Sequence, residues 1–433
     1  MIIKQMHNLF LESWHSSFRV MLVASYGLIL SVIFLYMHLL SAPALFFVGV
    51  ALLFSSIFIF SEKEQFLFIA FLIPNLFMYK YIEGPFAILG YFFIVLSLKY
   101  IFQHFYTIEL NLFLALHFGI CCLTCLYWSN FAILLSAIRF SLVFFLFYSL
   151  AKSTKEDEIS LILDFFVFGA VVAIALGIIY RTNAGTLLNG FFAGIKCERN
   201  YFTAALSPVF SIILIQLMKK KNSLIKEVFY FISITMYFLC LILAASRTAA
   251  IALVFPCVII LSYFFMLKDD LLKIRNFLLI MFILLVGSLF LISQYGGSID
   301  SFIERFSSND MKTGNNRFVL WQYYFEQTIS ELTTFFIGHG VVFGQSREAE
   351  HNLVVECFNK TGLLGLLTLL GTFFYSVTKS IQSVQKLQVS AFMPLCAVVF
   401  CYMGISALHA DQFSFLFILS LLVVRYCGNA GNT

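Results

Sequence analysis

Charged residues are scarce in this chain of 433 residues. Asp, Glu, Lys and Arg together make up 11% of it, whereas 61% of the residues are apolar, and proline occurs only 6 times. A composition so poor in charge excludes a water-soluble globular protein. The charged residues stand in short clusters between apolar runs, as expected when lipid cannot solvate an ion. The sequence therefore predicts a protein that lies in a lipid bilayer.

The net charge of +5 does not indicate nucleic-acid binding. In a membrane protein, an excess of Lys and Arg holds loops on the cytoplasmic side, and this accounts for the basic balance. We therefore expect the bilayer to be a partner of the chain and nucleic acid not to be one.

Metal-binding patterns are also missing from the sequence. Most of the 10 cysteines lie inside apolar runs, where a thiol behaves as a small hydrophobe. No CxxC pairs with a second CxxC, and no DxD-like carboxylate pair stands on the expected exterior face. The sequence predicts neither a metal nor a cofactor.

Apolar runs of membrane-spanning length recur along the whole chain. The length rule of ~20 residues predicts about 14 spans. A count of about 12 is equally consistent, because the first pair shares almost no loop and the third run is short. The basic loops 152–158, 219–226 and 268–275 are expected to face the cytoplasm, which makes both termini cytoplasmic. The predicted spans are 20–40, 42–60, 65–79, 85–101, 107–127, 130–151, 159–180, 202–218, 227–246, 248–266, 277–293, 361–378, 389–408 and 412–427.

One long connection interrupts the rhythm of short loops. It divides the chain into an N-terminal transmembrane bundle (1–293), an exterior loop (294–360) and C-terminal transmembrane helices (361–433). Long connections with structure of their own are usually functional. The stretch 317–337 has apolar residues at mixed spacings of three and four, which predicts an amphipathic helix along the membrane surface. Gly338, His339 and Gly340 end it.

Four side chains from separate segments fall on the exterior face in this topology: Arg199, Arg247, Arg317 and His351. Arg247 stands between two apolar runs with essentially no loop to keep it in water, and an anionic ligand is a natural partner there. Each residue also has a plainer interpretation: a solvated loop arginine, a snorkelling side chain, a lipid-headgroup contact or a structural histidine. Together they favour a diphosphate site.

The chemistry of a diphosphate leaving group fits this set of residues. Fixed guanidinium groups stabilise the negative charge that develops when the bond to a sugar breaks. A neutral imidazole, with an ordinary pKa of about 6.5, can accept the proton of an attacking sugar hydroxyl. The arginines would replace a metal ion.

Several further polar residues are candidates for supporting roles. Asn352 and Glu350 flank the candidate base, and His339 lies between two glycines, where a simple turn is the plainer interpretation. Asp411 stands at the exterior junction of the last two spans. This position is consistent with either a helix-end contact or a contact with the acceptor. Arg139 lies within a span and is expected to pack against the bundle interior.

The order of these motifs resembles the O-antigen ligase and O-antigen polymerase superfamily. An arginine in CERNYF is followed by SRTA between two spans, then by a long loop with NxR and W, by GxG, and by HN and G, over roughly residues 160–380. The resemblance implies an all-α polytopic membrane protein with a fold like the C-type glycosyltransferases, a periplasmic catalytic loop and a place in the bacterial inner membrane. It further implies an undecaprenyl-diphosphate-linked glycan as donor.

The resemblance also implies roles for single residues. Arg199 and Arg317 would bind the donor diphosphate, with Arg247 in the same role or bracing the site. His351 would be the base or would orient the acceptor, and Asn352 would orient the loop. The acceptor would be a lipid-linked repeat unit or the lipid A core.

Three alternatives remain at this point. The Phe-rich composition, with 55 Phe, favours a polymerase over a ligase by association only. A lipid-linked oligosaccharide flippase would instead predict charged residues along a central path and helices broken at mid-depth. A scaffold of a polysaccharide-export complex would use the long loop for docking. A chain-length regulator is a further candidate partner.

Overall fold

Helices account for nearly all of the described chain. The computed structural model describes residues 2–80, 88–104, 111–184, 192–195, 197–217, 222–244, 246, 250, 253, 317–340, 350–405 and 408–429, with the backbone alone for 2–16 and 429. The helices are α1 (Ile2–Leu40), α2 (Pro43–Ile59), α3 (Glu62–Leu72), η1 (Ile73–Met78), α4 (Ile88–His104), α5 (Leu112–Trp128), α6 (Phe131–Ser153), α7 (Glu156–Asn183), α8 (Arg199–Ala205), α9 (Val209–Leu217), α10 (Leu224–Ala244), α14 (Arg317–Ile329), α15 (Leu332–Ile337), α16 (Leu353–Gln382), η4 (Val389–Phe392), α17 (Met393–Tyr402) and α18 (Asp411–Asn429).

Seven helical segments of the described chain are long and apolar enough to cross a membrane. The prediction of a helical membrane protein is therefore confirmed. These segments are Ser17–Leu40, Phe131–Ser153, Glu156–Asn183, Arg199–Leu217, Leu224–Ala244, Leu353–Gln382 and Asp411–Gly428. Four shorter apolar helices accompany them: Pro43–Ile59, Ile88–His104, Leu112–Trp128 and Val389–Tyr402.

The predicted spans can be compared with these helices one by one. Every predicted span except 248–266 and 277–293 overlaps a helix or two consecutive helices. Those two lie outside the described residues, apart from Ala250 and Leu253. The predicted total of 12 to 14 spans stays a prediction, because only seven of the described helical segments are long enough to cross a bilayer.

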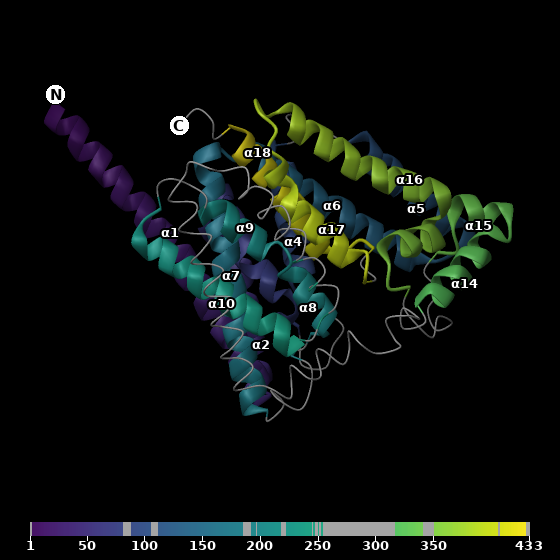
Figure 1. Ribbon diagram of the computed structural model, residues 1–433, viewed down its shortest axis with the longest axis horizontal. Coiled ribbons are helices and arrows are strands. Elements are labelled where there is room, and N and C mark those ends of the chain that lie inside the picture. The colour runs from purple at the N-terminus through teal and green to yellow at the C-terminus, as the bar shows by residue number, and fades with distance from the viewer. Residues whose placement is uncertain are drawn as a thin grey trace, which may run out of the picture.

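Helix α18 lies in the middle of the bundle. In Figure 1 it runs with α17 between the α5–α16 pair and the group formed by α7, α9 and α10. It packs on α6, α7, α16 and α17, and its membrane-length window is almost completely buried. Its serines do not oppose this burial, since Ser414 donates to the carbonyl oxygen of Ala410, just before the helix, and Ser420 donates to that of Leu416, one turn earlier in it. A helix that is apolar on all sides belongs inside.

Ion pairs gather at one end of the bundle. Glu64 at the start of α3 pairs with Arg19 (2.6 Å), and Lys63 pairs with Glu158 at the start of α7 (2.8 Å). Lys226 at the start of α10 pairs with Asp164 (2.7 Å). The loops 152–158 and 222–226, which the sequence assigns to one side of the membrane, therefore lie at the same end. The basic loop 268–275 lies outside the described residues.

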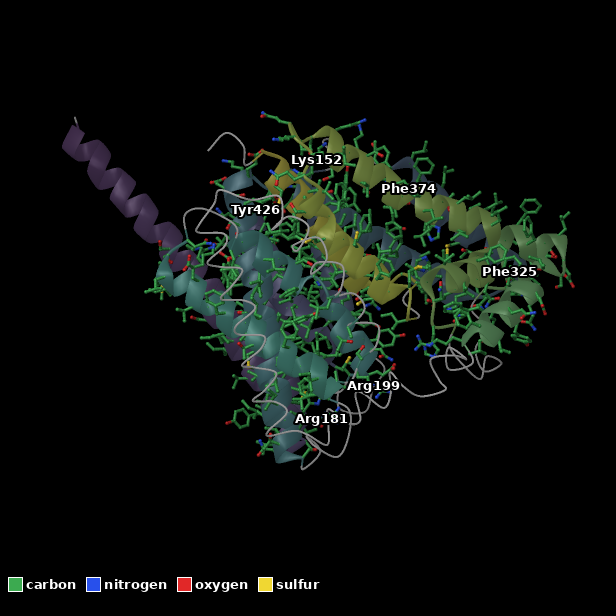
Figure 2. All side chains as sticks on the ribbon, in the orientation of Figure 1. Lys152, Arg181, Arg199, Phe325, Phe374 and Tyr426 are labelled. Carbon is green, nitrogen blue, oxygen red and sulfur yellow. The ribbon has the colours of Figure 1, made fainter. Side chains whose placement is uncertain are left out.

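The opposite end carries the described parts of the long connection. The predicted amphipathic helix over 317–337 is helical, but it is broken at Ser330 and Glu331 into α14 and α15. Both helices pack on α16 and leave apolar side chains exposed, among them Phe325, labelled in Figure 2. Helix α16 already begins at Leu353, so the last residues of the predicted loop are its first turns. Residues 294–316 and 341–349 lie outside the described chain.

Candidate functional site

Arg199 opens α8 at this second end of the bundle. It is half-buried and follows Glu198, the N-terminal flanking residue of the helix. Figure 2 shows it near the tip of the α8 region, with Arg181 close to the same end. The Oγ1 of Thr203, one turn later, donates to the Oγ of Ser246 (3.0 Å). Arg247 lies outside the described residues, but its neighbour Ser246 is held against α8.

Two tyrosines connect the Arg199 segment with elements far away in the sequence. Tyr201 lies within electrostatic range of two glutamates. Glu350 directly precedes His351, and Glu356 is in the first turn of α16. Buried Tyr402, the last residue of α17, lies within the same range of Cys197 and Tyr201. The end of α17 therefore lies near the chain on both sides of Arg199, and α17 packs on α8.

Arg317 reaches the same place from α14. Its Nη1 donates to the carbonyl oxygen of Gly404 (3.1 Å), two residues beyond the end of α17. One turn later, Trp321 Nε1 donates to the carbonyl oxygen of Glu350 (2.8 Å). The first turn of α14 is thus fixed both to the α17–α18 connection and to the segment that carries His351.

His351 lies in a constrained backbone. Its φ of 51° is in the left-handed region, which non-glycine residues rarely adopt. On one side, the buried carboxylate of Glu350 accepts from Asn359 Nδ2 (3.2 Å). On the other side, Asn352 Oδ1 accepts from the backbone N–H groups of Val354 (2.9 Å) and Val355 (3.2 Å). Both flanking side chains are engaged, so they hold the half-exposed imidazole between two fixed points.

The expected role of Asn352 can now be stated in structural terms. Its side chain caps the N-terminus of α16, as those of Asn111 and Asn130 cap α5 and α6. Capping begins the helix directly after His351, and this fixes where the histidine stands relative to α16.

Sequence reasoning missed a partly buried ion pair in the first turns of the helix that follows this histidine. Lys360 Nζ pairs with Glu356 Oε1 (2.6 Å), and Glu356 Oε2 accepts from the backbone N–H of Leu408 (2.9 Å). The signal was present, because an acid and a base one helical turn apart begin an otherwise apolar helix. The pair joins α16 to the same α17–α18 connection that Arg317 contacts.

His339 has a clear structural setting. Its backbone N–H donates to Asn359 O (2.8 Å), and its ring stands 6.1 Å from that of Trp128. Trp128 Nε1 donates to Gly338 O (2.7 Å). Within the described chain, the buried Nε2 of His339 has no hydrogen-bond partner. These contacts attach the end of α15 to α5 and α16.

The glycine beside His339 makes a close backbone crossing. Gly338 (φ 71°) and Gly362 (φ 66°) face one another: a Cβ on Gly338 would lie 2.4 Å from the backbone of Lys360 and Thr361, and one on Gly362 would lie 2.4 Å from that of Phe336. Gly362 also interrupts the helical geometry of α16. Only glycine fits at either position.

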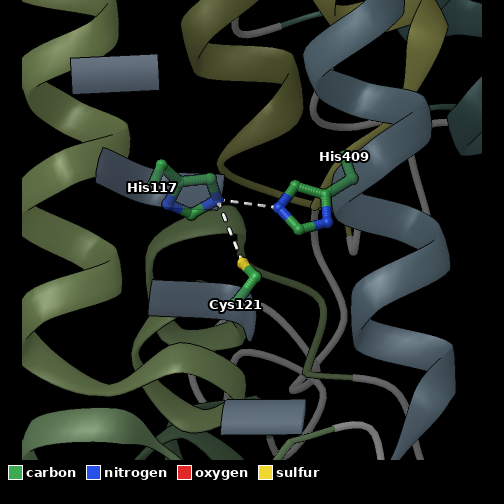
Figure 3. Close-up of side chains that lie close together, drawn as sticks. All are labelled: His117, Cys121 and His409. Atoms are coloured by element: carbon green, nitrogen blue, oxygen red, sulfur yellow. Dashed lines mark hydrogen bonds between the residues drawn. The ribbon is translucent and has the colours of Figure 1, made fainter. Parts of the chain in front are cut away.

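Two further contacts lie deeper in the bundle. Asp411, a candidate supporting residue, pairs with Arg139 of α6. His117 and Cys121 of α5 meet His409 of the α17–α18 connection, as Figure 3 shows. No role is predicted for His117 from the sequence, although an ionisable residue within an apolar run is a signal for one.

A cavity of about 390 Å³ lies at the opposite end of the bundle. Lys152, Lys379 and Arg425 line it, and Arg425 donates to the carbonyl oxygens of Ala151 (2.6 Å) and Thr154 (3.2 Å). It is separate from the end that carries Arg199, Arg317 and His351.

Neither a protein-family model nor a curated protein sequence matches the chain. The second end of the bundle presents two half-buried guanidinium groups, an imidazole in a constrained loop and two buried carboxylates. Such a set can bind an anionic group and exchange a proton with a hydroxyl beside it.

Proposed function

We propose that the chain is a membrane glycosyltransferase. It moves a glycan from an undecaprenyl-diphosphate carrier to a sugar hydroxyl at the periplasmic face of the bacterial inner membrane. The acceptor is a second lipid-linked repeat unit, which makes the enzyme an O-antigen polymerase. The alternative acceptor is the lipid A core, which would make it a ligase.

One observation carries the proposal. Arg199, Arg317 and His351 come from three separate segments, yet all three segments meet at α17 or its connection with α18. Helix α8 packs on α17, Arg317 donates to Gly404 O, and Glu356, in the helix that follows His351, accepts from the N–H of Leu408. Chance placement of solvated loop residues would not join these segments through buried groups such as Glu350, Glu356 and Tyr402.

The two arginines act on the leaving group. A guanidinium presents a fixed fork of donors that matches the oxygens of a phosphate, and it is always charged. Arg199 and Arg317 would hold the diphosphate from two sides and stabilise the charge that develops on it as the glycosidic bond breaks. The charge they supply removes the need for a metal ion in this step.

His351 acts on the acceptor. A neutral imidazole takes the proton of the attacking hydroxyl as the new bond forms. Glu350 and Asn352 are held by their own hydrogen bonds, so the loop keeps the ring in one region while substrates bind. His339 has no chemical role in the proposed reaction.

A transfer assay with two acceptors tests the proposal. The purified chain is given a labelled lipid-linked repeat together with unlabelled repeats or with lipid A core, and product length is measured. The parent chain should lengthen repeats, and His351→Ala should be slower by about 10²-fold or more, the usual effect of losing a general base. His104→Ala is the matched control, because His104 contacts Glu62 at the other end of the bundle.

Three results would contradict parts of the proposal. Full activity of His351→Ala, with normal insertion, would remove the base assignment. Transfer to lipid A core alone would favour the ligase. Transport of the lipid across vesicles without any new glycosidic bond would favour a flippase.

A further inference from the structure

Three side chains with metal-binding atoms meet inside the bundle, away from the candidate transfer site. His117 Nε2, Cys121 Sγ and His409 Nε2 all lie within 4.8 Å of one another. The two nitrogens are 2.8 Å apart, and the sulfur is 3.8 Å from His117 Nε2. His117 and Cys121 lie one turn apart on the same face of α5, and Figure 3 shows them with His409. His409 belongs to the α17–α18 connection, 292 residues after His117. All three are buried.

The outer nitrogens of both rings are engaged. His117 Nδ1 faces the carbonyl oxygen of Gly365 (3.0 Å), which can only accept, and Thr368 Oγ1 (3.2 Å), whose hydroxyl hydrogen is directed to Leu364 O and Gly365 O. This nitrogen therefore carries the proton. His409 Nδ1 faces Ser136 Oγ (3.0 Å), whose single hydroxyl hydrogen is directed to Ile133 O (2.9 Å). With both outer nitrogens protonated, the two Nε2 lone pairs would point towards each other. Such an arrangement is stable only with a cation between them.

This pattern is the one that metal-binding histidines show. A ligand histidine usually donates its other ring N–H to a carbonyl or another acceptor, and this fixes the ring with its free lone pair towards the metal. A backbone carbonyl and a serine oxygen take that place here. The competing arrangement needs no cation: Ser136 donates to His409, and His409 donates to His117.

We propose that His117, Cys121 and His409 bind one soft d¹⁰ cation, Cu⁺ or Zn²⁺. A thiolate with two imidazoles is the ligand set that these ions share. Tetrahedral zinc, with bonds of about 2.0 Å to nitrogen and 2.3 Å to sulfur, separates two ligand nitrogens by about 3.3 Å and a nitrogen from a sulfur by about 3.6 Å. The rings would therefore move apart by about half an ångström on binding.

The charges around the cluster do not oppose a cation. Arg139 is paired with Asp411, and Lys360 is paired with Glu356, so each nearby positive charge has its own counter-charge. The thiolate of Cys121 then supplies one negative charge, which balances all of the charge of Cu⁺ and half of that of Zn²⁺ in a buried site.

The site would be structural. The cation would tie α5 to the α17–α18 connection, which also receives Arg317 at Gly404 and Glu356 at Leu408. His409 has φ 60°, a left-handed conformation that persists only where the surroundings hold it. Coordination of the His409 ring to a metal would stabilise this backbone conformation. This role is independent of the proposed transfer reaction, which uses no metal.

Metal content of the purified full-length chain tests the proposal. The protein is stripped with a chelator in detergent, given excess Cu⁺ under anaerobic reducing conditions or excess Zn²⁺, desalted, and analysed for metal per chain. One equivalent of either ion should remain. Cys121→Ser and His409→Gln should each retain at least tenfold less. Cys125→Ser is the matched control, because Cys125 is a buried cysteine one turn further along α5 and should retain the full equivalent.

A second measurement needs no variant. X-ray absorption at the metal edge of the loaded parent chain should show one sulfur and at least two imidazole nitrogens. A shell of oxygen and nitrogen only would overturn the proposal, as would a parent chain that retains no more metal than a buffer control. Full retention by a Cys121→Ser protein that elutes normally in gel filtration would overturn it as well.

Discussion

Arg139 and Asp411 form a forked ion pair that joins α6 to the start of α18. Arg139 Nε is 3.0 Å from both carboxylate oxygens, and Nη2 contacts Oδ2. The Asp411 side chain is 1% exposed, and that of Arg139 is 38% exposed. A carboxylate at the first residue of a helix also interacts favourably with the helix dipole. In the structure, Asp411 is therefore engaged in holding two helices together.

Loss of this carboxylate should destabilise the bundle. We expect Asp411→Asn to lower the free energy of unfolding by about 1–3 kcal/mol, less than for a fully buried pair because Arg139 remains partly in solvent. Thermal unfolding in detergent measures the effect. The double variant with Arg139→Gln should regain part of the loss, because it removes the uncompensated charge; strictly additive losses would contradict the pairing.

The crossing of Gly338 and Gly362 predicts a large effect from a single methyl group. Gly362→Ala should lower the unfolding midpoint, because its Cβ would lie 2.4 Å from the Phe336 backbone and its φ is positive. Strain and overpacking together amount to about 2–4 kcal/mol. Gly119→Ala in α5 is the control, since nothing lies within 4 Å of its added Cβ, and it should be neutral or slightly stabilising. Equal midpoints for the two variants would refute the crossing.

The Arg19–Glu64 pair predicts a pH-dependent stability. Burial raises the pKa of Glu64, but the hydrogen bonds from Arg19 and Ser61 and the charge of Arg19 outweigh it, so the pKa lies below its ordinary 4.5. A depressed pKa contributes stability above the unfolded-state value that is lost as pH falls through the folded-state value.

Glu64→Gln provides the comparison for this pair. At pH 7 the parent chain should be more stable than this variant by about 1–3 kcal/mol, the range for hydrogen bonds to charged groups. The difference should begin to shrink as pH falls below about 4.3, the unfolded-state pKa, and should be lost below the folded-state pKa, where the carboxyl group is protonated in both states. Unfolding midpoints of the two proteins at both pH values measure it. A gap that stays constant with pH would show that the charge of Glu64 does not contribute.

The shape of the guanidinium predicts how Arg317 responds to substitution. Arg317→Lys should keep the positive charge but lose the forked contact, so glycan transfer should stay reduced by about tenfold or more. Arg317→Ala should be lower still. Initial rates at saturating donor, with expression and insertion checked for each variant, provide the comparison. Parent activity in the lysine variant would mean that only charge is needed there.

The helices were predictable because the bilayer leaves a strong signal in the sequence. Apolar runs such as 130–151 and 159–180 agree with α6 and α7 to within three residues at each end, since the limits are set by clusters such as 152–158. The break of the 317–337 helix was not predictable, because Ser330 and Glu331 are unremarkable within an amphipathic pattern. The break follows from packing on α16, which sequence periodicity does not encode.

The site was predictable only in its exposed parts. Arg199, Arg317 and His351 stood out because they are polar groups at the ends of apolar runs. The interactions between their segments could not be read from the sequence, because Tyr201, Glu356 and Tyr402 interact with residues far away in the chain. His117 and Cys121 were overlooked for the same reason, because their partner His409 lies in a different part of the chain.

The end of α15 is anchored through its main chain. Thr124 Oγ1 and Trp128 Nε1 donate to the carbonyl oxygens of Ile337 and Gly338, and the N–H groups of residues 339 and 340 donate to Asn359 and Lys360. None of these four bonds uses a side chain of residues 337–340. The side chains of Ile337 and His339 are therefore not needed for these four bonds, and substitutions at either position should leave this part of the anchor in place.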